Sequence, residues 1–289
     1  MQAAFFTISN VLEKEEAIKL IKDAIKKTYG KKGEEIVEMN WKAVDRTAES
    51  LVQVDVPGSL PDKHAEEMKL IPDDADDFTK NVIEPVMKLK GDEIPVSKMT
   101  EDGYVPSGTT ALEKRGVAPR VPHWLADKCI QCNQCSFVCP HAAIRPKLIK
   151  KDKLKNAPDS FNTIEAMVKD KDEYEYKIQV FIEDCVSCYN CVNECPKDAL
   201  VMKPLQEERE AGEDKNVEFF TSLPEDVLGN VAKETTVKGS QFKQPLLEFS
   251  GACAGCGETP YVKTITQLYG DRMIIANATG CSSIWGGTF

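Results

Sequence analysis

The chain has 289 residues, of which 29% are charged, and its formal net charge at pH 7 is -10. This negative charge argues against a nucleic-acid partner, because phosphate binding relies on clustered lysine and arginine. No apolar run approaches the roughly 18 residues of a membrane-spanning helix, and the start MQAAFFTISN lacks the basic region of a secretory signal. We therefore expect a cytoplasmic protein with no membrane role.

The N-terminal residues 1–45 carry two amphipathic patterns. Residues 13–28, EKEEAIKLIKDAIKKT, place alanine and isoleucine on one stripe with lysine and glutamate opposite, which predicts a surface helix. Residues 34–44, EEIVEMNWKAV, repeat this pattern. Too few residues precede these helices to build a sheet on which they could pack. We therefore interpret residues 1–45 as the end of a domain whose body lies outside this chain.

Two segments are predicted to connect domains. Eight of the sixteen prolines lie between Pro57 and Pro122, and proline at that density interrupts helices and strands. Residues 46–121 are therefore expected to form an extended linker with only short elements, such as one in DDFTKNVIEPVMKLK at 76–90. Residues 206–245, which contain the charged run EEREAGEDK, are predicted to be a second connector.

Residues 122–205 contain an internal repeat. The windows CIQCNQCSFVCP (129–140) and CVSCYNCVNECP (185–196) are offset by 56 residues. Each is followed by a similar short segment, HAAIRP in the first copy and KDALVMKP in the second. Duplication of one structural unit explains this pattern best. The stretch 146–177 between the copies is long for such a repeat, so we expect an insertion.

The C-terminal residues 246–289 predict the beginning of an α/β sheet. A helix is expected from Thr259 to Gly270, because Thr-Pro suits a helix start and glycine a helix stop. MIIANA (273–278) is typical of a buried parallel strand, and TGCSS (279–283) of a polar loop after it. The expected helix carries an apolar stripe made of Val262, Ile265 and Leu268.

The sequence contains eleven cysteines, eight of them in the two repeated windows. Disulfide scaffolds are usually short secreted chains, which this chain does not resemble. Thiolates otherwise select iron-sulfur clusters, zinc or copper(I), and structural zinc sites usually combine two close pairs far apart in sequence. The run C-x-x-C-x-x-C followed by C-P is instead the bacterial ferredoxin pattern, in which the fourth cysteine binds the other cluster. We therefore expect two 4Fe-4S clusters.

This pattern assigns four cysteines to each cluster. One set is Cys129, Cys132, Cys135 and Cys195, and the other is Cys185, Cys188, Cys191 and Cys139. Clusters that exchange ligands in this way must lie close together. Closeness suits a relay of single electrons, although a purely structural role for the clusters is the alternative.

Three further cysteines lie near the C-terminus, namely Cys253, Cys256 and Cys281. They could be buried free thiols acting as small apolar residues. The glycines around Cys253 and Cys256 instead indicate a loop whose backbone lies close to another group. The alternative is a third 4Fe-4S cluster that lacks one ligand in this chain. An organic cofactor is expected nearby, because ligands bind beyond the carboxyl ends of parallel strands.

At this point the sequence resembles a known family. LLEFSGACAGCGETPYVK (246–263) and GDRMIIANATGCSSIWGG (270–287) are similar to the start of the thiamine-diphosphate domain of pyruvate:ferredoxin oxidoreductases. VPSGTTALEKRGVA (105–118) resembles the linker of that family, and residues 122–205 resemble its inserted ferredoxin domain. Residues 1–45 resemble the end of its coenzyme A domain. The fold class this implies is α+β, with a two-cluster ferredoxin-like domain between parts of two α/β domains.

The resemblance implies an enzyme that decarboxylates pyruvate on thiamine diphosphate with Mg²⁺ and transfers the acetyl group to coenzyme A. Its electrons would pass through three 4Fe-4S clusters to ferredoxin or flavodoxin. By the family pattern, Cys253, Cys256 and Cys281 hold the cluster nearest the cofactor, with a fourth cysteine beyond this chain. Glu258 and Cys281 match positions that touch thiamine diphosphate, and Asn40 matches a coenzyme A contact.

Several parts of the family pattern are missing from this chain. The pyruvate-binding domain, most of the coenzyme A domain and the diphosphate and magnesium motif are absent, so no catalytic residue is assigned here. We expect the chain to be inactive alone, and to function with the remaining domains or subunits as a homodimer. The alternative functions are a stand-alone polyferredoxin-type electron carrier and an iron-sulfur regulator without redox turnover.

One basic segment bears on partners. RPKLIKKDKLK (145–155) has six basic residues and one acidic residue on an otherwise acidic chain. A solvated surface loop is the simpler interpretation. The functional alternative is a docking surface for an acidic ferredoxin, which would act mainly on the association rate. Its lysines are Lys147, Lys150, Lys151, Lys153 and Lys155.

Overall fold

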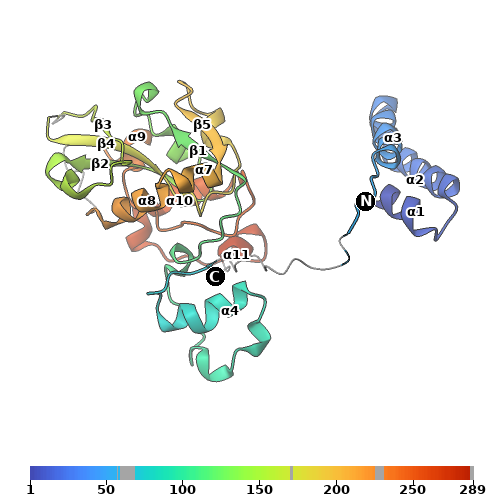
Figure 1. Cartoon of the computed structure of the whole chain (residues 1–289), viewed down its shortest axis with the longest axis horizontal. Coiled ribbons are helices and arrows are strands. Elements are labelled where there is room, and N and C mark those ends of the chain that lie inside the picture. Colours follow the sequence, from blue (N-terminus) through green and yellow to red (C-terminus); the bar gives the residue numbers. More distant parts are fainter. Residues whose placement is uncertain (57, 59–68, 170–171, 225–230, 287–289) are drawn as a thin grey trace. The chain divides into compact units, whose positions relative to one another are not determined.

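The computed structural model describes residues 1–56, 58, 69–169, 172–224 and 231–286. The chain divides into two compact units, Met1–Glu66 and Glu67–Phe289, which are described separately (Figure 1). The chain combines helices with sheets whose strands are all antiparallel, so the fold class is α+β. None of the helices in the described ranges is both long and apolar enough to cross a bilayer.

The first unit consists of three helices, α1 (Gln2–Ser9), α2 (Lys14–Tyr29) and α3 (Glu34–Glu49). The two helices predicted from the amphipathic patterns are confirmed as α2 and α3, and α3 continues past the predicted end because no glycine or proline interrupts it. Trp41 on α3 donates a hydrogen bond from Nε1 to the carbonyl oxygen of Lys22, at 3.0 Å. The buried residues between the helices are Ala3, Ala17, Val37 and Val44.

The second unit begins with a segment of short elements. A π-helical turn (Thr79–Ile83) continues into α4 (Glu84–Met87), which confirms the short element predicted at 76–90. Asp76 caps the turn by accepting a hydrogen bond from the amide of Thr79 at 2.9 Å. Short 3-10 helices lie elsewhere along the chain, at Gly30–Lys32, Gly91–Glu93, Val96–Lys98, Thr109–Ala111, Ala126–Lys128, Lys151–Asn156 and Gly270–Arg272.

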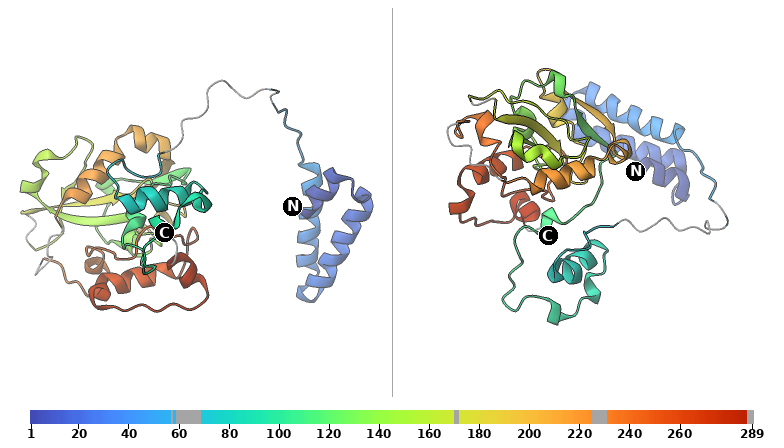
Figure 2. Two further views of the ribbon diagram at one scale, coloured as in Figure 1. Left: turned by 90° about the horizontal axis from the view of Figure 1, so that it is seen from below. Right: turned by 60° about the vertical axis from the view of Figure 1, so that its left-hand side comes forward.

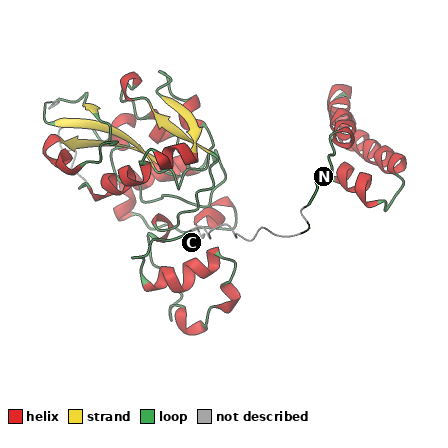
Figure 3. Cartoon of the chain, viewed as in Figure 1, coloured by secondary structure: helices red, strands yellow, loops and turns green. Residues whose placement is uncertain are grey.

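Two antiparallel sheets form the centre of the second unit (Figure 3). In one, β1 (Arg120–Trp124) pairs with β5 (Leu200–Pro204). In the other, β2 (Ile144–Lys150) pairs with β4 (Tyr174–Val180), and β3 (Ile164–Glu165) pairs with the opposite edge of β4.

The basic segment 145–155 is therefore not the surface loop that we predicted. It forms most of β2 and the start of the 3-10 helix that follows. The prediction failed because lysines that alternate with aliphatic residues suggest solvent exposure, whereas β2 is largely buried along its length. Lys147 itself donates hydrogen bonds from Nζ to the carbonyl oxygens of Phe220 and Leu223, at 3.1 and 3.3 Å.

The predicted duplication is confirmed by the strand register. Arg120 and Pro204 are paired in the first sheet. The residue 56 positions after Arg120 is Tyr176, the residue 56 positions before Pro204 is Leu148, and these two are paired in the second sheet. Helix α6 (Asn190–Asn193) likewise begins and ends 56 residues after α5 (Gln134–Phe137). The two copies exchange strands, since each sheet combines one strand from each cysteine repeat.

The segment after β5 differs from the predicted connector. It forms α7 (Leu205–Glu210), α8 (Glu213–Ser222) and α9 (Val237–Ser240). Helix α8 lies along β4, and α7 lies beside β1 and β5 (Figures 1 and 2). Residues of this segment enter the same apolar core as the strands, namely Leu205, Phe220 and Leu223. The charged run therefore lies on α7 and the start of α8, two helices that pack on the ferredoxin-like core.

The C-terminal helix predicted from Thr259 to Gly270 is confirmed as α10 (Thr259–Tyr269). In its apolar stripe, Val262 and Leu268 are half-buried and Ile265 is 45% exposed. The face that is buried in the unit is polar and consists of Thr259, Lys263, Thr266 and Gln267.

The buried parallel strand predicted at 273–278 is wrong. These residues form no strand, and Ile274 is fully exposed. A parallel strand is stable only when neighbouring strands and helices cover it, and no described residue pairs with this segment. The loop predicted at 279–283 is replaced in part by a short helix, α11 (Cys281–Gly286).

Candidate functional site: three sets of cysteines

The first predicted set of cysteines converges from both copies of the repeat. Cys135 lies on α5, Cys129 and Cys132 precede that helix, and Cys195 follows α6. Burial raises the pKa of Cys135, and repulsion from Cys129, Cys132 and Cys195 raises it further. Thiols influence one another in this way only at short range. The structure thus brings together the four sulfurs that the sequence pattern grouped.

The second set converges in the same manner. All four of its cysteines line one cavity: Cys139, Cys185, Cys188 and Cys191. Burial raises the pKa of Cys185 to about 12, with further contributions from Cys139 and Cys188. The pKa of Cys191 is also raised, first by burial and then by neighbours that include Cys135. Because Cys135 belongs to the first set, the two sets are adjacent.

The loops that carry these cysteines share an unusual backbone. In the first copy Gln131 and Asn133 have left-handed φ values of 55° and 62°, and in the second Ser187 and Tyr189 have 57° and 67°. Non-glycine residues adopt this conformation rarely, so its repetition at corresponding positions indicates that the two loops share one backbone conformation. In both copies the left-handed residues alternate with the first three cysteines of the loop.

The donor set fits a 4Fe-4S cluster. Backbone amides of Gln131 and Ser187 donate to the sulfurs of Cys129 and Cys185 at 3.4 and 3.5 Å, and the amide of Ala199 donates to that of Cys195 at 3.2 Å. Amide donors stabilise thiolate sulfur. Without a metal, burial favours the neutral thiols. With iron bound, these cysteines would be held as thiolate ligands, because a cation favours the charged form of the sulfur.

The third set is only partly assembled. Cys253 and Cys256 lie on one loop, where the amide of Cys256 donates to the carbonyl oxygen of Cys253 at 3.0 Å. Cys281 lies at the start of α11 and is exposed. In the described part of the chain, no hydrogen bond or core contact joins Cys281 to that loop.

The loop of the third set lies against the second set. Gly255, with a φ of 75°, lies so close that a Cβ atom added to it would be 3.8 Å from Cβ of Cys188 and 3.6 Å from Oδ1 of Asn190. His141, next to the Cys139-Pro140 pair, binds the same loop through a hydrogen bond between Nε2 and the carbonyl oxygen of Ala252 at 2.9 Å. The glycines of this loop therefore allow a close approach, as the sequence indicated.

Lys263 is a buried residue near the site that the sequence analysis missed. Its Nζ donates hydrogen bonds to the carbonyl oxygens of Ser136 and Phe137, the latter at 3.3 Å. Burial lowers its pKa to about 8, while Cys139 has the opposite effect. The signal in the sequence was a lysine on the face of α10 away from the apolar stripe.

The two other predicted site residues are Glu258 and Asn40. Glu258 is exposed and accepts a hydrogen bond on Oε2 from Nε1 of Trp285 at 3.2 Å, which connects the start of α10 to α11. Asn40 lies on α3 in the first unit and lines a cavity of about 560 Å³. Its side-chain amide donates to the carbonyl oxygen of Ile36 at 2.8 Å.

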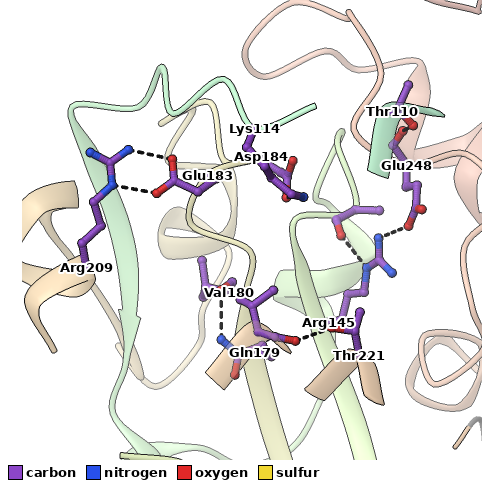
Figure 4. Close-up of polar contacts among 12 residues, drawn as sticks. Thr110, Lys114, Arg145, Gln179, Val180, Glu183, Asp184, Arg209, Thr221 and Glu248 are labelled. Carbon is purple, nitrogen blue, oxygen red and sulfur yellow. Dashed lines mark hydrogen bonds and ion pairs between the residues drawn. The ribbon is translucent and has the colours of Figure 1, made fainter. Parts of the chain in front are cut away.

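A network of ion pairs holds the segment before β1 and the segment after α9 on the core (Figure 4). Lys114 pairs with Asp184 at 2.9 Å, and Arg145 pairs with Glu248. Burial raises the pKa of Asp184 to about 6, although Lys114 opposes this shift. Asp184 directly precedes Cys185, so the network fixes the backbone at the entrance to the second cysteine loop.

Comparisons with known proteins agree with this architecture. Residues 128–199 match the 4Fe-4S dicluster domain family, and residues 64–118 match the EKR family, a domain of unknown function. The pyruvate:ferredoxin oxidoreductase of Moorella thermoacetica is 56% identical over 290 residues, which cover 100% of this chain and 24% of that protein. The pyruvate-flavodoxin oxidoreductase of Enterobacter agglomerans is 48% identical over 290 residues, covering 99% of this chain and 24% of the relative.

A third relative has a different name. The pyruvate dehydrogenase [NADP(+)] of Cryptosporidium parvum is 48% identical over 318 residues, which cover 100% of this chain and 16% of that protein. The chain spans about a quarter, or less, of the length of these relatives. Over its whole length, the chain corresponds to one segment of the pyruvate:ferredoxin and pyruvate-flavodoxin oxidoreductases.

Proposed function

We propose that this chain is the electron-transfer segment of an enzyme that oxidises pyruvate to acetyl-coenzyme A and CO2 and reduces ferredoxin or flavodoxin. The observation that carries the proposal is the convergence of two crossed cysteine sets, with the loop of a third set packed against one of them. A stand-alone electron carrier needs only the first two sets, so the third set favours the enzyme.

The two crossed sets would each hold one 4Fe-4S cluster. The ligands of the first are Cys129, Cys132, Cys135 and Cys195, and those of the second are Cys139, Cys185, Cys188 and Cys191. When bound, 4Fe-4S clusters accept and release single electrons. The chain's own contribution is to hold the sulfurs in left-handed loops, to direct backbone amides at them and to bury the inner thiols from water.

The order of the three sets along the molecule gives the direction of transfer. Gly255 brings the third set next to Cys188 of the second set, and Cys191 of the second set neighbours Cys135 of the first. The second set is therefore the middle of the row. The third set would be nearest the thiamine diphosphate, and the first set would be nearest the external acceptor.

The remaining parts of the enzyme would complete the cofactor sites. Cys253, Cys256 and Cys281 would hold a third cluster together with a cysteine outside this chain. Glu258 and Cys281 would contact thiamine diphosphate, whose Mg²⁺ is held by residues elsewhere, and Asn40 would contact coenzyme A. The exposed position of Cys253 and Cys281 is consistent with a site that needs further protein around it. The complete enzyme would act as a homodimer.

The test uses the complete protein purified without oxygen. Addition of pyruvate and coenzyme A should produce the EPR signals of reduced 4Fe-4S clusters, and Cys256→Ala should abolish this reduction while dithionite still reduces the two ferredoxin-type clusters. Ser282→Ala, beside Cys281, is a control that should behave as the unmodified protein. Clusters that stay oxidised in the unmodified protein, with bound thiamine diphosphate present, would refute the proposal.

A further inference from the structure

Lys263 lies between the two ferredoxin-type cysteine sets. It extends from α10 into the unit, is 1% exposed and donates to the carbonyl oxygens of Ser136 and Phe137. These two residues lie in the short stretch between Cys135, a member of the first set, and Cys139, a member of the second. The lysine ammonium therefore lies beside one of the two stretches of backbone that link a cysteine of one set to a cysteine of the other.

The charge of Lys263 has no carboxylate partner in the described residues. Its hydrogen-bond partners are carbonyl oxygens, and it forms none of the ion pairs of the described chain. The other buried cations of the described part of this unit differ in this respect: Arg145 pairs with Glu248, and Glu213 and Glu208 act on Lys177. An unpaired buried ammonium is strongly unfavourable, so a compensating negative charge is expected nearby. With clusters bound, the thiolate sulfurs of Cys135 and Cys139 would supply negative charge at this place.

We propose that Lys263 is a fixed positive charge shared by the two ferredoxin-type clusters, and that it raises the reduction potential of both. This inference rests on the proposed function, because it requires clusters on the eight cysteines. A cluster gains one negative charge when it gains one electron. A nearby buried cation stabilises that reduced form more than the oxidised form, since the interior screens charges weakly. A cation between the sites also weakens the repulsion between two reduced clusters.

A second lysine provides a comparison within the same unit. Lys238 on α9 donates from Nζ to the carbonyl oxygen of Met167 at 3.3 Å, and it faces Cys129 and Cys132 of the first set. It is more exposed than Lys263, and no cysteine of the second set acts on it. Removal of its charge should therefore lower the potential of the first cluster alone, by a smaller amount.

The experiment is a potentiometric titration, followed by EPR, of the complete protein with its clusters. Lys263→Gln keeps hydrogen-bond donors and removes the charge, and Lys263→Met removes both. Each should lower both potentials, and the expected change in each reduction equilibrium is about tenfold, or roughly 59 mV for a one-electron couple. Lys147→Met is the matched control, because Lys147 also donates to two carbonyl oxygens but those of Phe220 and Leu223, which belong to neither cysteine loop. It should leave both potentials unchanged.

The outcomes separate this inference from the proposed function. If both Lys263 variants lower the two reduction potentials and Lys147→Met leaves them unchanged, the result supports the proposed effect of the Lys263 charge. Full clusters with unchanged potentials overturn the inference and leave the proposed function intact. Failure of both Lys263 variants to take up iron, while Lys147→Met takes it up normally, also overturns it, because the lysine would then be a structural requirement. Absence of iron from the unmodified protein refutes the proposed function itself.

Discussion

Arg145 shows how one residue joins several parts of the second unit. Its Nε donates to the carbonyl oxygen of Ala142 at 2.7 Å, and its Nη2 pairs with Glu248 (Figure 4). The guanidinium lies 4.5 Å from the ring centroid of Phe181 and 5.1 Å from that of Phe249. A planar cation that stacks and donates at the same time suits arginine better than lysine.

Removal of this guanidinium should destabilise the second unit. Arg145→Met leaves Glu248, whose side chain is only 17% exposed, without its partner. We expect the free energy of unfolding to fall by about 3 kcal/mol, as is typical when one partner of a buried pair is removed. Lys243→Met is the control, because Lys243 pairs with Glu234 near the surface and should matter little. Denaturant titration gives both values; equal losses in the two variants would contradict the prediction.

At the scale of elements, the duplicated loops contain a second pair of left-handed positions. Ala142 in the first copy has a φ of 53°, and Asp198, which is 56 residues later, has a φ of 48°. Both lie just before the strand that follows their cysteine loop. The conformation costs roughly 1–2 kcal/mol for a residue with a Cβ atom, and less for aspartate than for a bulky side chain.

Asp198 permits a test of this backbone because its side chain is exposed. Asp198→Gly should leave stability unchanged or slightly higher, whereas Asp198→Val should lower it by about 1–2 kcal/mol, since β-branched residues tolerate this conformation worst. Lys197→Val, at the exposed neighbour whose φ is not positive, should have little effect. The measurement is again the free energy of unfolding. A valine that is tolerated equally at both positions would show that residue 198 is not constrained.

The elements differ in how well the sequence predicted them. Helices α2, α3 and α10 were predictable, because their apolar residues recur with a helical period. The duplication was predictable because the cysteine spacing repeats after 56 residues, whereas the assignment of the cysteines to clusters stays a prediction. Local patterns did not reveal partners that are distant in sequence. The strand expected at 273–278 depends on such partners, and so does the buried polar face of α10, where Lys263 reaches Ser136.

The segment after β5 illustrates the same limit. Its charged run suggested a connector, but Phe220 and Leu223 place it in the core together with β4. The basic strand β2 was taken for a loop because its lysines were assumed to be solvated. The roles of Glu258 and Asn40 stay predictions, since both depend on protein outside this chain.

At the scale of the whole molecule, the basic segment remains a candidate surface for an acidic acceptor, with a changed set of residues. Nζ of Lys147 donates hydrogen bonds to the carbonyl oxygens of Phe220 and Leu223. Nζ of Lys151 lies 3.8 Å from Oε1 of Glu175. The lysines that stay exposed for docking are Lys150, Lys153 and Lys155.

Neutralising these three lysines to glutamine should slow reduction of an acidic ferredoxin by the complete enzyme at low salt. It should also flatten the dependence of the rate on ionic strength, because electrostatic steering is screened by salt. The control is the same change at three exposed lysines of α2, namely Lys14, Lys19 and Lys27. Equal rates and salt dependence in all three proteins would show that the acceptor docks elsewhere.

The central claim is that two clusters are held by cysteines exchanged between the repeats. EPR of the dithionite-reduced complete protein tests it most directly, with single alanine substitutions at Cys132, Cys195, Cys188 and Cys139. We predict about eight irons in the two ferredoxin-type sites. Cys195→Ala should perturb the same signal as Cys132→Ala, and Cys139→Ala the same signal as Cys188→Ala. If Cys195→Ala instead perturbed the signal that Cys188→Ala affects, the crossed arrangement would be contradicted.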